Sequence, residues 1–175
     1  ICLRDNGLEI LSHIPREEHV IIHWGMTMAA YPFWSAVAMH IGRQLRLQGT
    51  TSVGQVQRRI SEQYGERGAV SLAVQKIFLS LADWGLLRRT ANRGIYVPGL
   101  SFAINDIRVI AWLVEAFLHV HQGGPLMLDT ILNSPSLFPF LINPVSAGQL
   151  VKASGRLDAF SVGIGQDFLV IGKAN

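Results

Sequence analysis

The chain has 175 residues, enough for one compact domain or for a domain with a small appendage. Charged residues make up only 15% of it, against about 25% in ordinary globular domains, and its mean hydropathy is +0.30. We therefore expect a large core, or an apolar face reserved for a partner. The single cysteine, Cys2, excludes an intramolecular disulfide and fits a reducing, cytoplasmic location. Because the sequence begins at Ile1 and not at a methionine, further residues are expected before it.

The most apolar stretch, residues 19–42, contains no Asp, Glu, Lys or Arg and is long enough to cross a bilayer. It also contains three histidines, and Pro32 lies near its centre, where a proline ends one helix and opens the next. The sequence therefore predicts two buried helices, at residues 16–30 and 32–47, and no contact with a membrane. A membrane-associated protein is the alternative.

A helix, a tight turn and a second helix follow. Ser52 precedes a helical apolar pattern, and Gln55 lies three residues after Ser52, which is the spacing of a capping box. Gly65 is placed to take the left-handed backbone conformation that ends this helix. A second helical pattern covers residues 70–84. Residues 91–94, Ala-Asn-Arg-Gly, then form a turn between two short strands, which predicts a two-stranded hairpin.

The last third of the chain has weaker patterns. Asn105 or Asp106 can cap a helix that runs to residue 120 and ends at the Gly-Gly-Pro of residues 123–125. We expect short helices at residues 126–132 and 146–154. The remaining expectations are a packed loop or a docking segment at residues 133–140 and a terminal hairpin at residues 160–171.

The basic residues are concentrated in one segment. Residues 43–98 contain nine basic and three acidic side chains, a net charge of +6, whereas the rest of the chain has a net charge of −3. Such a concentration is expected of a surface that binds phosphate. The alternative is a solvated face whose arginines serve solubility.

The two parts of this segment differ in how well they suit DNA. With Val70, Val74, Ile77, Leu81 and Trp84 facing a core, the outward face of the second helix holds Leu72, Gln75, Lys76, Leu79 and Asp83. Two leucines and an acid read bases poorly, so this helix either binds mainly phosphate and shape or packs on another helix or subunit. The hairpin, with arginines along it and at its tip, suits a contact to the DNA backbone or minor groove. An arginine-tipped turn that only keeps the hairpin soluble is the alternative there.

The order helix, turn, helix and basic hairpin, with the junction Asp83-Trp84-Gly85-Leu86-Leu87, resembles a winged helix-turn-helix. The resemblance covers residues 32–98. It implies that the helix at residues 32–47 is the first helix of that core, and that the second helix of the motif lies in the major groove. It also implies that helices outside the motif can form a dimer.

We find no pattern typical of an enzyme. His19 and His23 are four residues apart on a predicted helix, but no third ligand lies at a telling distance, so no metal site is expected. His119 and His121 end a helix, where a positive side chain suits the helix dipole. No glycine pair has the spacing of a phosphate loop, and no serine lies in a nucleophile elbow. We expect no cofactor.

These patterns predict a mainly α protein with small β structure. Residues 1–31 would be an N-terminal extension with a helix, residues 32–98 a winged-helix domain, and residues 99–175 a helical and hairpin extension. The expected function is binding of double-stranded DNA, as a transcriptional regulator or as the DNA-contacting subunit of an assembly, with a homodimer or a protein partner at the C-terminal extension. The alternative is a non-catalytic protein–protein assembly module. The residues expected to contact DNA are Arg58, Arg59, Arg67, Ser71, Gln75, Lys76, Arg88, Arg89, Asn92 and Arg93.

Overall fold

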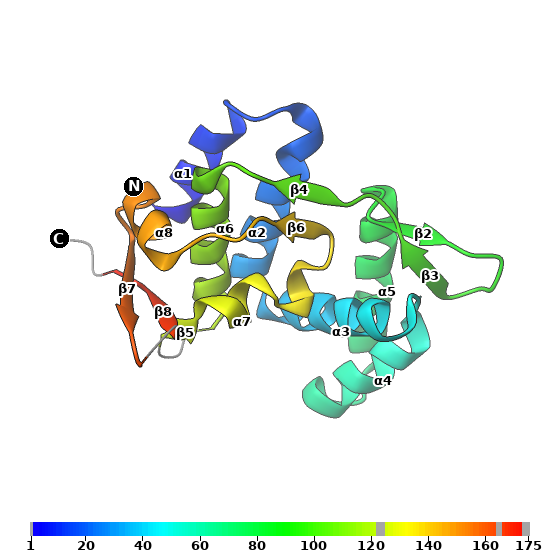
Figure 1. The fold of residues 1–175 in the computed structure, drawn as a ribbon. Helices are drawn as coiled ribbons and strands as arrows, with labels where there is room; N and C mark the ends of the chain where they lie inside the picture. The colour runs from blue at the N-terminus through cyan, green and yellow to red at the C-terminus, as the bar shows by residue number, and fades with distance from the viewer. Residues whose placement is uncertain (1, 122–124, 164–165, 173–175) are drawn as a thin grey trace. The chain divides into compact units, whose positions relative to one another are not determined.

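The computed structural model describes residues 2–121, 125–163 and 166–172. These residues are mainly helical and contain three small sheets, which confirms the predicted class (Figure 1). The chain forms two compact units. Unit 1 comprises Ile1–Pro32, Ala103–Asn133 and Ile142–Asn175, and unit 2 comprises Phe33–Phe102 and Ser134–Leu141. The units are interleaved along the chain, whereas the sequence predicts three consecutive segments.

Unit 2 contains the predicted helices and hairpin, with one further strand. Its elements are α3 (Pro32–Gln48, which starts at the last residue of unit 1), β1 (Thr51–Ser52), α4 (Val53–Tyr64), α5 (Gly68–Asp83), β2 (Leu87–Arg89), β3 (Ile95–Pro98) and a 3-10 turn, Pro135–Leu137. The strands form an antiparallel sheet in the order β1-β3-β2, so the predicted two-stranded hairpin has a third strand at its edge.

The start of α4 is held by two residues. The Ser52 hydroxyl accepts the Gln55 backbone N–H at 3.5 Å, as the capping-box spacing predicts. The Ser52 backbone N–H, however, donates to Oε1 of Gln44 on α3 at 2.9 Å, so Gln44 takes the place expected of the Gln55 side chain. At the other end, Gly65 has φ 89° and ψ 154°. The predicted positive φ is confirmed, but the ψ is extended and not helical.

The core of unit 2 lies between its three helices and the sheet. It consists of large apolar side chains from each element: Trp34, Val37, Ile41, Val56, Ile60, Val74, Phe78, Leu81, Leu87 and Tyr96. Full burial of one such side chain contributes about 1.5–3 kcal/mol. The predicted loop at residues 133–140 packs into this unit in part, because Arg46 donates from Nη2 to the Ser134 carbonyl oxygen at 3.1 Å.

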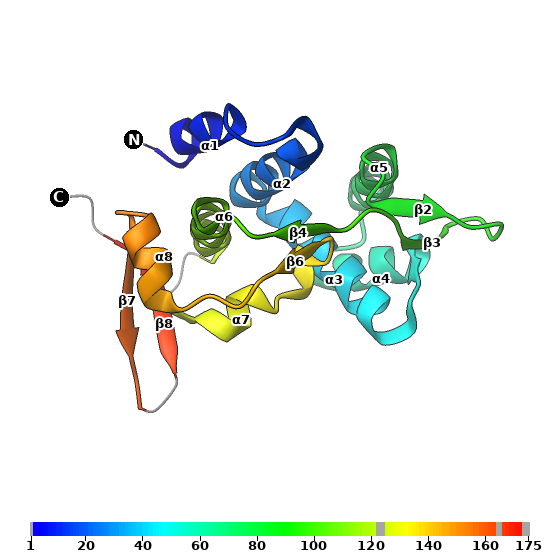
Figure 2. The ribbon, with the colours of Figure 1, turned by 45° about the horizontal axis from the view of Figure 1, so that its top comes forward.

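Unit 1 is arranged around one buried helix. Its elements are α1 (Leu3–Leu11), a 3-10 turn (Arg16–Glu18), α2 (His19–Ala30), α6 (Ile107–Val120), β5 (Leu126–Met127), α7 (Leu128–Leu132), α8 (Ala147–Ala153), β7 (Leu157–Ser161) and β8 (Asp167–Ile171). Helix α6 packs against α1, α2 and α8 (Figure 2). The terminal hairpin is confirmed, and β5 joins it in the order β5-β8-β7.

The Trp112 ring of α6 packs directly against glycines of α1 and α2. Its Nε1–H donates to the Leu3 carbonyl oxygen at 2.9 Å, and its ring lies against Gly7 of α1 and Gly25 of α2. A Cβ at Gly25 would lie 2.7 Å from Cη2 of the Trp112 ring, well inside contact distance. The glycines therefore provide the space that the indole fills.

One sequence expectation needs correction here. The segment at residues 126–132 begins as strand β5, because Leu126 and Met127 pair with Leu169 and Phe168, and only Leu128–Leu132 are helical. Helix α6 ends at Val120, as the sequence predicts, while most of the Gly-Gly-Pro stop lies outside the described residues. Strands β4 (Phe102–Ile104) and β6 (Phe140–Ile142) form the remaining sheet. None of the described helices is long and apolar enough to span a membrane.

Candidate nucleic-acid interface

The outward face of α5 is largely as the sequence predicts. Leu72 is 51% exposed and Leu79 is 38% exposed, and Gln75 and Lys76 are exposed between them. Trp84, predicted to face the core, is instead 38% exposed. Trp84 is the C-cap residue of α5 and keeps helical backbone angles, so its exposure follows from its place at the end of the helix and not from a change of face.

The hairpin separates its two consecutive arginines. Arg89 is paired with Tyr96 and Arg88 with Val97 across the antiparallel strands. Because successive residues of a strand point to opposite faces, Arg89 shares a face with the buried Tyr96 while Arg88 lies on the other face. The Arg88 Nε–H donates to the Pro98 carbonyl oxygen at 3.2 Å.

A groove of about 510 Å³ lies between α5, the start of α4 and the hairpin, and we call it the hairpin groove. It is lined by Val53, Gln57, Gln75, Leu79, Arg89, Thr90, Asn92, Arg93, Gly94, Ile95 and Tyr96. No acidic side chain lines it. Arg89 and Arg93 are exposed, and neither forms an ion pair with any residue that the structure describes. The groove therefore presents two uncompensated guanidinium groups beside two exposed amides, Gln75 and Asn92.

The tip of the hairpin holds Asn92 and Arg93 in place through its backbone. Gly94 has a φ of 79°, a backbone conformation that residues other than glycine rarely adopt. The Ile95 N–H donates to the Asn92 carbonyl oxygen at 3.1 Å, and the Asn92 N–H donates to the Thr90 hydroxyl at 3.2 Å. On the opposite wall, the Gln57 amide donates to the Ser71 carbonyl oxygen at 2.9 Å and links α4 to α5.

A second groove, of about 920 Å³, lies between α3 and α4, and we call it the α3–α4 groove. It is lined by His40, Arg43, Gln44, Leu47, Gln48, Gln55, Arg58, Arg59, Glu62 and Gln63. Arg59 pairs with Glu62 at 3.3 Å. Burial lowers the pKa of the half-buried His40, and the charges of Arg43 and Arg59 lower this pKa further, while Glu62 opposes them.

The ten predicted DNA contacts are thus divided among three places. Gln75, Arg89, Asn92 and Arg93 meet in the hairpin groove, and Arg58 and Arg59 line the α3–α4 groove. Arg67, Ser71, Lys76 and Arg88 line neither groove. Gln57 was missed, although it lies four residues after Val53 and so on the same face of α4. Gln44 was missed as well, and no local pattern signals it, because its role depends on contact between helices.

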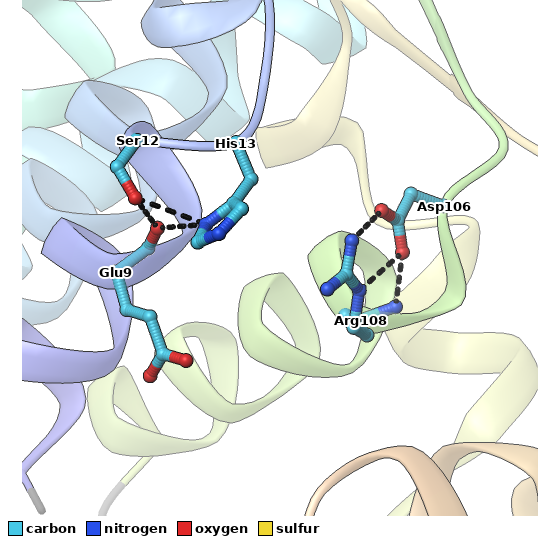
Figure 3. Close-up of polar contacts among 5 residues, drawn as sticks. All are labelled: Glu9, Ser12, His13, Asp106 and Arg108. Atoms are coloured by element: carbon cyan, nitrogen blue, oxygen red, sulfur yellow. Dashed lines mark hydrogen bonds and ion pairs between the residues drawn. The ribbon is translucent and has the colours of Figure 1, made fainter.

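Unit 1 has a smaller pocket of about 200 Å³ that includes Glu9, His13, Asp106 and Arg108. Arg108 and Asp106 pair at 2.9 Å, and this contact lowers the pKa of the Asp106 carboxyl group. His13 Nδ1 lies 2.8 Å from the Glu9 carbonyl oxygen, while the Glu9 carboxylate is directed away from the His13 ring (Figure 3).

Helix α6 holds a buried carboxylate, paired with a partly exposed arginine, that sequence reasoning did not find. Glu115 is fully buried, with Oε1 2.6 Å from Nη2 of Arg156 and 3.6 Å from Nε2 of His119. The His121 ring lies against the Phe117 ring, with the ring centroids 4.6 Å apart and the planes tilted by 33°, and burial lowers the pKa of His121. A positive charge on His121 is therefore opposed by burial, contrary to the expectation from the helix dipole.

Comparisons with known proteins return no relative: no family model, no curated protein and no solved structure matches this chain.

Proposed function

We propose that this chain is a DNA-binding protein and that unit 2 is a winged helix, acting in a transcriptional regulator or in the DNA-contacting subunit of an assembly. The order α3-β1-α4-α5-β2-β3 and the antiparallel sheet order β1-β3-β2 support the winged helix. In this arrangement α5 corresponds to the helix that enters the major groove, and the hairpin corresponds to the wing.

The observation that carries the proposal is the hairpin groove. Arg89 and Arg93 line one groove that has no acidic lining residue, and this arrangement favours the binding of phosphate oxygens. Gln75 and Asn92 line the same groove, and amide side chains hydrogen-bond to both phosphates and base edges. The leucines on α5 limit base readout, so the binding is largely to phosphate and DNA shape.

The test is binding of the full chain to a labelled duplex, measured by fluorescence anisotropy at low salt. Binding that depends mainly on phosphate has dissociation constants of about 10⁻⁴–10⁻⁶ M at physiological salt. We expect Arg89→Gln combined with Arg93→Gln to weaken binding by about tenfold or more. Arg16→Gln combined with Lys152→Gln removes the same charge from exposed residues of unit 1 and is the matched control. Equal affinities of the two variants would contradict the proposal.

A second candidate function is a protein–protein assembly module, with a homodimer or another protein as partner. It is favoured by the exposure of Leu72 and Leu79, which lie seven residues apart and so on one face of α5. In this case Leu72→Ser combined with Leu79→Ser would abolish a stoichiometric complex seen by light scattering or native mass spectrometry. The duplex affinity of the chain would then not depend on Arg89 and Arg93.

A further inference from the structure

The α3–α4 groove is strongly basic, and the hairpin groove does not account for it. Three arginines line it against one acid, Glu62, which pairs with Arg59. Arg43 and Arg58 form no ion pair with any residue in the described part of the chain. Two guanidinium groups are therefore exposed in this groove without a neutralising carboxylate.

Amide groups add hydrogen-bond donors to this charge. Gln44 is the best defined of them, because its Oε1 accepts both the Ser52 backbone N–H and the Thr51 hydroxyl, each at 2.9 Å. A backbone N–H can only donate, so this contact fixes which end of the amide is the oxygen. The NH₂ group of Gln44 is consequently left as a donor. Arginine with amide donors is the combination that typically contacts DNA phosphates.

The two grooves lie on different sides of α4. Val53 and Gln57 line the hairpin groove, whereas Gln55, Arg58, Arg59, Glu62 and Gln63 line the α3–α4 groove. At about 100° per residue, these five residues lie about 100–160° around the helix from Gln57. A straight duplex docked on one side of a helix does not reach the opposite side, so the grooves cannot serve one straight segment.

From this arrangement we infer that the α3–α4 groove is a second phosphate-binding surface, and that one copy of unit 2 holds two DNA segments, one in each groove. The identity of the partner as DNA rests on the proposed function. The existence of a second basic groove on a different side of α4 does not rest on the proposed function, because it follows from the residues that line each groove.

The experiment is a capture assay with the full chain. One duplex is immobilised on beads, and retention of a second, fluorescent duplex is measured with and without the protein at low salt. We expect the wild-type chain to retain the second duplex. Arg43→Gln combined with Arg58→Gln should lower retention by about tenfold or more, while the hairpin groove still binds a single duplex. Arg16→Gln with Lys152→Gln is again the charge-matched control.

The outcomes separate this inference from the proposed function. Binding of a single duplex that depends on Arg89 and Arg93, without capture of a second one, overturns the inference and leaves the proposed function standing. Retention by R43Q/R58Q equal to that of the wild type also overturns it, since bridging would then come from a dimer with one hairpin groove per copy. An equal loss in the control would show that capture depends on net charge and not on the groove. Circular dichroism melts show that each variant is folded.

Discussion

Arg88 and Arg89 are neighbours in β2 but belong to opposite faces of the hairpin. Arg89 lines the hairpin groove together with its cross-strand neighbour Tyr96, whereas Arg88 donates its Nε–H to the Pro98 carbonyl oxygen on the other side. The two residues have the same charge and nearly the same place in the sequence. They therefore form a matched pair for a test of groove geometry.

Arg89→Gln is expected to weaken duplex binding more than Arg88→Gln. Of these two arginines, only Arg89 lines the hairpin groove with the amide side chains of Gln75 and Asn92, which are expected to share a phosphate contact with it. At 0.1 M salt we expect a loss of several-fold to about tenfold for Arg89→Gln, and a smaller loss for Arg88→Gln, measured by anisotropy. Equal losses would mean that only the total charge of the hairpin matters.

The hydrogen bonds of Gln44 make a prediction about stability. Gln44→Ala removes the acceptor of the Ser52 N–H and of the fully buried Thr51. Loss of the partner of a buried polar group costs about 1–3 kcal/mol, so urea unfolding should show a decrease of that size. Gln48→Ala, one turn further along α3, removes an exposed contact to the Thr50 carbonyl oxygen and should change stability by less than about 0.5 kcal/mol. A Gln44→Ala variant as stable as Gln48→Ala would contradict the double role of Gln44.

Gly42 tests the packing of residues 134–141 against α3. A Cβ at Gly42 would overlap the Pro135 backbone carbonyl group, which cannot rotate away as a side chain can. We expect Gly42→Ala to destabilise the protein by about 1–3 kcal/mol or more. Gly54 lies in α4 with nothing near its Cβ position, so Gly54→Ala should instead stabilise by about 0.5–1 kcal/mol through helix propensity. The two thermal melting temperatures should therefore move in opposite directions, and a common direction would be evidence against this packing.

His40 reports on the charge of the α3–α4 groove. Burial is the largest cause of its lowered pKa, followed by the charges of Arg43 and Arg59. Arg43→Gln removes one of these positive charges, so the charged imidazolium becomes less unfavourable and the His40 pKa should rise. An NMR titration of the His40 ring protons measures this, with Arg67→Gln as the control because Arg67 lines neither groove.

The same lowered pKa fixes the sign of a stability effect. The folded state binds a proton at His40 less readily than the unfolded chain, whose histidine pKa is about 6.5. This contribution to stability is therefore present above pH 6.5 and is lost as the pH falls through the lower, folded-state pKa. His40→Gln should flatten the pH dependence of the unfolding free energy over this range. An unchanged slope would show that His40 is not desolvated.

The elements of unit 2 were predictable because their signals are local. The Ser52 cap, the apolar periodicity of α4 and α5 and the turn at Gly94 all act within a few residues. Strand β1 was not predictable in this way, since it has two residues and owes its strand geometry to pairing of Thr51 with Tyr96. The partnership of Gln44 with Ser52 depends in the same manner on contact between helices.

The sequence could predict several residues of the candidate site, but not how they are divided between the two grooves. The alternation of a strand already separates Arg88 from Arg89, and a helical projection already separates Arg58 and Arg59 from Gln57. The sequence does not show which face of α4 packs near the hairpin, so it could not divide the arginines between two grooves. The sequence could not predict how the chain alternates between the two units either, because this depends on contacts between residues far apart in the chain.

The most direct measurement is the salt dependence of duplex binding for the wild-type chain and for the variant that combines Arg89→Gln with Arg93→Gln. Each phosphate contact contributes about 0.9 to the slope of log K against log salt concentration. We expect a slope that is shallower by about 1.8 in the variant, because two phosphate contacts are lost. Parallel lines for the two proteins, or no salt dependence in the wild-type chain, would contradict the assignment of the hairpin groove to DNA.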